Sequence, residues 1–134
     1  MLTENPSLVT TDWSGNTLYA VNELLEYEGE AQGAVSAADE LAYNKSVGAA
    51  PTASLMDAGG VIARAYSAKT TPHMFVIDPK GNLIYNGAID DHASANAADT
   101  KTAKNYVATA LGEAMAGKPV SSPQTRPYGC SVKY

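Results

Sequence analysis

The chain has 134 residues with 45% hydrophobic residues and a formal net charge of −5, enough for one domain with a single core. The acidic balance argues against a nucleic-acid or anionic-membrane partner, and no apolar run approaches the roughly 18 residues of a membrane span. The single cysteine, Cys130, excludes an intramolecular disulfide and a zinc site of the usual multi-cysteine kind.

The N-terminal quarter contains few signals of regular structure. Residues 1–16 indicate an irregular lead-in with a short strand near residues 7–11. Residues 17–28 fit either a helix or a short strand at residues 18–21. The segment lacks the basic and apolar regions of a secretory signal, so we expect a cytoplasmic protein.

The middle of the chain contains two capping signals. Ser36 with Asp39 resembles a capping box and predicts a helix to about Val47, which Gly48 ends. Residues 51–56 form a short apolar run that indicates a strand. Asp57 is placed to cap a short helix that reaches Tyr66.

A strand–turn–strand–helix order follows. Residues 73–78 are apolar and rich in strand formers, and the four-residue turn at 79–82 leads into a return strand at 83–87. After a polar loop, an apolar stripe predicts a helix over residues 99–116. A tail then follows, with Cys130 within it. This order predicts an α/β layered domain with a mixed sheet.

The Thr71–Pro72 step opens the apolar strand. Pro72 cannot donate to a sheet ladder, so it belongs at the first residue of a strand or on an edge. X-Pro bonds are also the usual place for a cis peptide, although most X-Pro bonds are trans. The residues alone therefore leave the isomer of this bond open.

Three stretches carry a resemblance to a known family: "ARAYSAKTTPHMFVIDPKGNLIYNGAIDD", "KTAKNYVATALGEAMAGKPV" and "RPYGCSVKY". They resemble the C-terminal half of thioredoxin-like redoxins of the alkyl hydroperoxide reductase/thiol-specific antioxidant, or peroxiredoxin-like, type. The resemblance covers roughly residues 31–134. It implies a thioredoxin-like mixed sheet with flanking helices and a cis bond before Pro72. It also implies that Thr71, Pro72 and His73 contact the substrate.

One part of the family pattern is missing. Relatives carry a nucleophilic cysteine at the start of the first helix, where the helix N-terminus lowers the pKa of the thiol. This chain has no cysteine before Cys130, so the first strand–helix unit is absent or replaced. The resemblance thus divides the chain into a divergent N-terminal segment (1–30), a thioredoxin-like domain (31–117) and a cysteine-containing tail (118–134).

Losing that unit would also leave a central strand without a neighbour, and unpaired buried backbone groups are costly. Residues 1–30 must therefore fill the gap, or another chain must, or the fold is rearranged. Residues 18–21 are the best candidate for the replacing strand.

Cys130 is the candidate catalytic residue. In relatives with two thiols, a C-terminal cysteine of this kind acts as a resolving partner, which implies that Cys130 forms a mixed disulfide with a partner protein or a second copy. Nearby Lys133 would favour the thiolate and the terminal carboxylate would oppose it. The alternative is a residual thiol without a partner.

Two other candidates have simpler explanations. His73 either faces a redox site or is an ordinary packed or edge histidine. Asp90, Asp91 and His92 group two carboxylates with an imidazole, but consecutive residues rarely converge on one metal. We therefore expect no metal site and no cofactor.

Three hypotheses on function remain. The first is a redox protein that acts through Cys130 and a partner thiol. The second is a non-catalytic thioredoxin-fold module for binding or self-assembly through an open sheet edge. The third is a truncated descendant without separate activity. The resemblance favours a peroxiredoxin-like redoxin, an oxidoreductase if active, and also allows a periplasmic or exported location.

Overall fold

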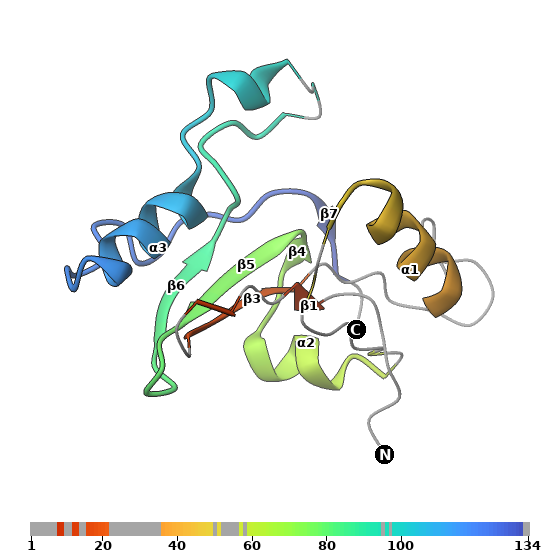
Figure 1. Cartoon of the computed structure of the whole chain (residues 1–134), viewed down its shortest axis with the longest axis horizontal. Helices are drawn as coiled ribbons and strands as arrows, with labels where there is room; N and C mark the ends of the chain where they lie inside the picture. Colours follow the sequence, from red (N-terminus) through yellow and green to blue (C-terminus); the bar gives the residue numbers. More distant parts are fainter. Residues whose placement is uncertain are drawn as a thin grey trace.

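Helices flank small antiparallel sheets, which confirms the α/β class (Figure 1). The computed structural model describes residues 8–9, 12–13, 16–21, 36–49, 51, 57, 59–94, 96 and 98–132. The strands are β1 (Leu8–Val9), β2 (Asp12–Trp13), β3 (Asn16–Val21), β4 (Thr70–Thr71), β5 (His73–Ile77), β6 (Leu83–Gly87) and β7 (Cys130–Ser131). The helices are α1 (Ala37–Ser46), α2 (Val61–Tyr66) and α3 (Tyr106–Met115), with the 3₁₀ turn η1 (Asp99–Lys101) before α3.

The larger sheet has the strand order β1-β3-β5-β6, and β2 pairs with a second part of β3. All of these pairings are antiparallel, whereas a mixed sheet was expected, and the isolated bridge between Asn86 of β6 and Gln124 is parallel. The tight turn between β5 and β6 explains the antiparallel pairing of the hairpin, because a parallel pair needs a long crossover. The strand predicted at residues 51–56 lies outside the described residues except for Pro51.

Strand β5 is the centre of the core because its two faces pack against different helices. Met74 and Val76 point to one face and join α3 through Val107. Phe75 points to the other face and packs with Ala63 of α2. This alternation follows from the two-residue period of a strand. The side chains of Met74, Phe75 and Val76 are all buried.

β5 has a partner on both edges. β3 pairs with it through residues 17–21, and β6 pairs with its other edge. The chain's own N-terminal residues therefore occupy the place beside β5, which is the first of the three alternatives that the sequence left open. The strand expected at residues 18–21 is confirmed within β3, while residues 22–35 lie outside the described residues.

The capping signals act as predicted at α1 and, with a shift, at α2. The Ser36 hydroxyl accepts a hydrogen bond from the Asp39 amide, and Gly48 follows the helix with a positive φ of 69°. Asp57 is not the residue next to α2. Its carboxylate instead accepts hydrogen bonds from the amides of Val61 (2.7 Å) and Ala63 (2.9 Å), and so satisfies two amides at the start of the helix.

The helix predicted over residues 99–116 begins later than expected. After η1, the chain leaves helical geometry because the Lys104 amide donates to the Asp91 carboxylate at 2.8 Å and the Lys104 carbonyl accepts from the Asp91 amide at 3.2 Å. Asn105 then caps α3, its side chain accepting a hydrogen bond from Ala108 at 2.8 Å. Gly117 ends the helix as predicted. Among the described residues, no helix is long and apolar enough to cross a membrane.

Candidate functional site

Cys130 lies beside the Thr71–Pro72 turn. Strands β4 and β7 form a two-stranded antiparallel sheet in which Thr71 is opposite Cys130 and Thr70 is opposite Ser131. The peptide bond before Pro72 is cis, as the resemblance implied. The tertiary structure therefore brings together Cys130 and the predicted substrate-contacting residues Thr71 to His73, which are 57 to 59 residues away in sequence.

Gly129 makes this approach possible. Its φ of 139° lies in the region that favours glycine, and a Cβ there would overlap the carbonyl oxygen of Thr71 and lie 3.2 Å from Cδ of Pro72. Any side chain at this position would push β7 away from the turn. The glycine before Cys130 thus determines how close the β7 backbone comes to the Thr71–Pro72 turn.

The Cys130 thiol is free and exposed. Exposure lets a partner's sulfur reach it, which thiol–disulfide exchange requires. Cys130 is also the chain's single cysteine, so a disulfide at this position must join two molecules. Lys133, whose charge we expected to favour the thiolate, lies outside the described residues.

His73 is buried and only 4% exposed. Its Nδ1 accepts a hydrogen bond from the Lys69 amide at 3.2 Å, and its ring packs against Phe75 with centroids 4.4 Å apart. Burial, followed by the nearby Lys69 charge, lowers the pKa of His73 to about 4. The side chain is therefore a packed, neutral histidine, in agreement with the simpler of the two readings.

This packing leaves one polar atom of His73 without a partner. Because Nδ1 accepts a hydrogen bond, the neutral ring carries its proton on Nε2. That buried N–H has no hydrogen-bond partner within the described part of the chain. A buried donor without an acceptor is costly, so the site is suited to an incoming oxygen atom.

Cys130 belongs to residues 123–132, here called the C-terminal strap. Hydrogen bonds to the sheet hold this segment in place. The Asn86 amide donates to the Pro123 carbonyl, and the Thr125 amide donates back to the Asn86 carbonyl. The Thr125 hydroxyl accepts from the Ala88 amide at 2.9 Å and shares a hydrogen bond with the Tyr85 hydroxyl at 2.7 Å. The strap is thereby fixed along β6 before it reaches β4.

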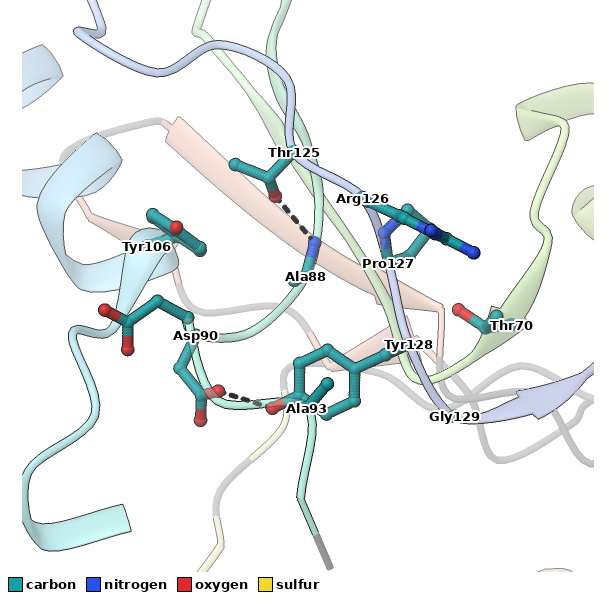
Figure 2. Close-up of a pocket in the computed structure, with 11 residues that line it drawn as sticks. Thr70, Ala88, Asp90, Ala93, Tyr106, Thr125, Arg126, Pro127, Tyr128 and Gly129 are labelled. Atoms are coloured by element: carbon teal, nitrogen blue, oxygen red, sulfur yellow. Dashed lines mark hydrogen bonds between the residues drawn. The ribbon is translucent and has the colours of Figure 1, made fainter. Parts of the chain in front are cut away.

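The strap makes a further contact near its middle, where the Tyr128 hydroxyl donates to the Asp90 carboxylate (Figure 2). Asp90 belongs to the acidic group singled out in the sequence. Its neighbours Asp91 and His92 pair with each other at 2.9 Å, which raises the pKa of His92 and lowers that of Asp91. No group of metal-ligating side chains gathers in the part of the chain that the structure describes.

Two open cavities lie on either side of the strap. The first, of about 570 Å³, is drawn in Figure 2 and includes Asp90, Asp91 and Tyr128. The second, of about 730 Å³, includes His73 and Phe75. Both share four residues, three of them from the strap: Thr70, Thr125, Arg126 and Pro127.

No local pattern in the sequence marks the strap as part of the site. Its anchoring residue, Thr125, lies in a proline-containing tail with no periodic pattern, and its contacts are about 40 residues away along the chain. Gly87 is the one residue of β6 whose identity is related to the docking of the strap. Its φ of 148° and its close approach to Thr125 require glycine, but both become visible only in the folded chain.

Comparison with known proteins finds no matching family model and no matching curated protein. Among solved structures, a hypothetical protein SMc02350 from Sinorhizobium meliloti 1021 is similar, with 30% sequence identity and a TM-score of 0.56. The match covers 69% of this chain and 49% of that one, so the chain spans about half the length of this neighbour. The likeness therefore shows a shared fold over the matched part.

Proposed function

We propose that this chain is a thioredoxin-like, peroxiredoxin-like redoxin whose Cys130 exchanges with the thiols or disulfides of a partner. The observation that carries the proposal is the position of Cys130 opposite Thr71, beside Pro72. The exposed sulfur adds the required access. The thioredoxin-like fold is part of the same proposal and is supported by helices on opposite faces of β5.

The exchange step balances with a partner disulfide as the oxidant. The Cys130 thiolate attacks one sulfur, a new Cys130–sulfur bond forms, and the partner's S–S bond breaks. The departing partner thiolate takes the electron pair of that bond and the proton that Cys130 lost. A different thiol, a third one of the partner or one of another molecule, can then attack the partner's sulfur in the mixed disulfide, which forms a new disulfide and releases Cys130 as the thiolate.

A complete cycle of peroxide reduction requires a second thiol in addition to Cys130. Peroxide would oxidise Cys130 to a sulfenic acid, and a thiol must then condense with it to complete a cycle. With one cysteine per chain, that thiol has to come from another molecule. We therefore expect peroxide consumption near background with a small thiol reductant, and Cys130-dependent turnover would contradict this expectation.

The exchange proposal is tested with an aromatic disulfide, 5,5′-dithiobis(2-nitrobenzoate). We expect one thiolate released per chain from the wild type and none from Cys130→Ser. A matched control, Cys130→Ser/Ser131→Cys, moves the thiol by one exposed residue to the other side of β7. If the position beside Pro72 matters, this control should react more slowly, by roughly threefold or more.

Equal rates for the wild type and the moved thiol would show that Cys130 is an ordinary exposed thiol and would overturn the proposal. Gly129→Ala gives a second check that keeps the thiol. Because its Cβ would overlap the Thr71 carbonyl, we expect it to change the exchange rate without removing the reaction.

A non-catalytic binding or self-assembly module is the second candidate, and one observation favours it. Helix α1 has no buried residues, and Leu41 and Tyr43 of the helix and its C-cap residue Val47 are more than half exposed. Exposed apolar side chains on one short helix are suited to association with another protein surface. This candidate predicts binding that survives Cys130→Ser.

A further inference from the structure

The second cavity combines three features that are independent of Cys130. It lies between α2, the β5–β6 hairpin and the C-terminal strap, and its volume is about 730 Å³. Cavities of this size accommodate small organic molecules. The residues that decide its chemistry are Tyr66, Lys69, His73, Phe75, Asn86 and Arg126.

The first feature is a hydrogen-bond donor that lacks an acceptor. His73, which lines the cavity, is 96% buried, and its Nε2–H has no partner among the described residues. The Lys69 amide occupies Nδ1, so the ring cannot gain an internal partner by changing tautomer. A ligand oxygen at Nε2 would remove the cost of this unpaired donor.

The second feature is the charge of the lining. Lys69 and Arg126 both contribute to the cavity, and no carboxylate does so within the described part of the chain. The lining is therefore locally positive although the chain has a net charge of −5. The first cavity, across the strap, instead contains Asp90 and Asp91. The two cavities therefore differ in the charge that they favour.

The third feature is an apolar wall. Tyr66 and Phe75 pack edge to face with ring centroids 5.2 Å apart and an interplanar angle of 67°. Leu83 and Pro127 add further apolar surface. An aromatic or aliphatic group can pack against this wall while a charged group reaches the cations.

We propose that the second cavity binds a small carboxylate with an aromatic or aliphatic body. One carboxylate oxygen accepts the hydrogen bond from His73 Nε2, Lys69 and Arg126 balance its charge, and the body packs against Tyr66 and Phe75. This site goes beyond the proposed thiol exchange and does not require Cys130.

The test uses two probes, phenylacetate and hexanoate, titrated into ¹⁵N-labelled protein and followed by NMR. We expect shifts in the signals of the cavity residues and in the His73 Nε2–H resonance, with binding detectable below about 10 mM. Phenylacetamide, which lacks the charge, should bind more weakly than phenylacetate. Cys130→Ser should bind both probes as the wild type does, which separates this result from the exchange test.

Two surface variants keep the test independent of folding defects. Lys69 and Arg126 are exposed, and Lys69→Gln and Arg126→Gln should each weaken phenylacetate binding by roughly two- to fivefold. Lys118→Gln is the matched control, because it removes one exposed charge beyond the end of α3, on the opposite face of the sheet. It should leave the affinity unchanged.

Three results would overturn the inference. One is the absence of shifts with both probes. Another is equal binding of phenylacetate and phenylacetamide. The third is a set of shifts centred on the first cavity, around Asp90 and Tyr128, with no change at His73.

Discussion

At the scale of single residues, His73 and Gly129 determine the chemistry of the site. His73 is neutral because burial and the nearby Lys69 charge disfavour its protonated form. Gly129 lets the backbone before Cys130 approach the Thr71 carbonyl. One residue thus provides an uncharged buried donor, and the other lets the backbone at Cys130 pair with that of Thr71.

His73 makes stability depend on pH. Its pKa is about 4 in the folded protein and has the ordinary value of 6.5 when unfolded. Between these two pH values the unfolded chain binds more protons than the folded chain. The stability that comes from keeping His73 neutral is therefore fully present above pH 6.5. It falls as the pH drops towards 4, by up to about 3 kcal/mol.

The measurement is urea unfolding across this pH range, combined with NMR titration of both histidines. We expect His73 to stay neutral where the exposed His92 is already protonated, because Asp91 raises the pKa of His92. In His73→Phe, the free energy of unfolding should change little between pH 6.5 and 4. In His92→Gln, it should fall over this range as it does in the wild type. A His73 midpoint near 6.5 would contradict the prediction.

At the scale of elements, the short helix α2 depends on one side chain. It has only six residues and follows Gly59 and Gly60, so its intrinsic stability is low. Asp57, 8% exposed, accepts hydrogen bonds from two of its first amides. Since α2 covers Phe75 and forms one side of the second cavity, this capping contact supports the core and the cavity together.

Removing that carboxylate should be costly. Asp57→Ala would leave two amides of α2 without their acceptor, and we expect a loss of about 2 kcal/mol in the free energy of unfolding. Ser36→Ala is the matched control, because it removes a cap from α1, a helix without buried residues. Equal losses for the two variants in urea unfolding would contradict the role given to Asp57.

At the scale of the whole molecule, the strap and the sheet edges decide how the chain can associate. β5 is paired on both edges, and the strap bridges to β6 at Asn86. The central strand therefore needs no second copy. The exposed thiol of Cys130 and the exposed apolar side chains of Leu41 and Tyr43 on α1 are two features of the described residues that favour contact with another molecule.

We expect association to depend on oxidation. Mild oxidation should give a disulfide-linked dimer, and a reductant should return it to the monomer, because the chain has no second cysteine to compete. Analytical ultracentrifugation of reduced, oxidised and Cys130→Ser protein measures this. A dimer that persists in reduced Cys130→Ser protein would instead support association through α1 or a sheet edge.

Local signals in the sequence determined much of the fold. Apolar runs bounded by turn residues predicted β5 and β6, and the capping box at Ser36 predicted α1. The Thr71–Pro72 step located the mouth of the central strand. Each of these signals acts over a few neighbouring residues, so the sequence alone was sufficient to reveal it.

Only the tertiary structure decided the rest, since those features depend on contacts between distant segments. The hydrogen bonds of Lys104 with the Asp91 carboxylate and the Asp91 amide moved the start of α3 to Tyr106. The pairing of β3 with β5 selected the strand over the helix at residues 18–21, and the docking of the strap placed Cys130 beside Thr71. No local pattern encodes such pairings, because they become favourable only when the core and the strap contacts form together.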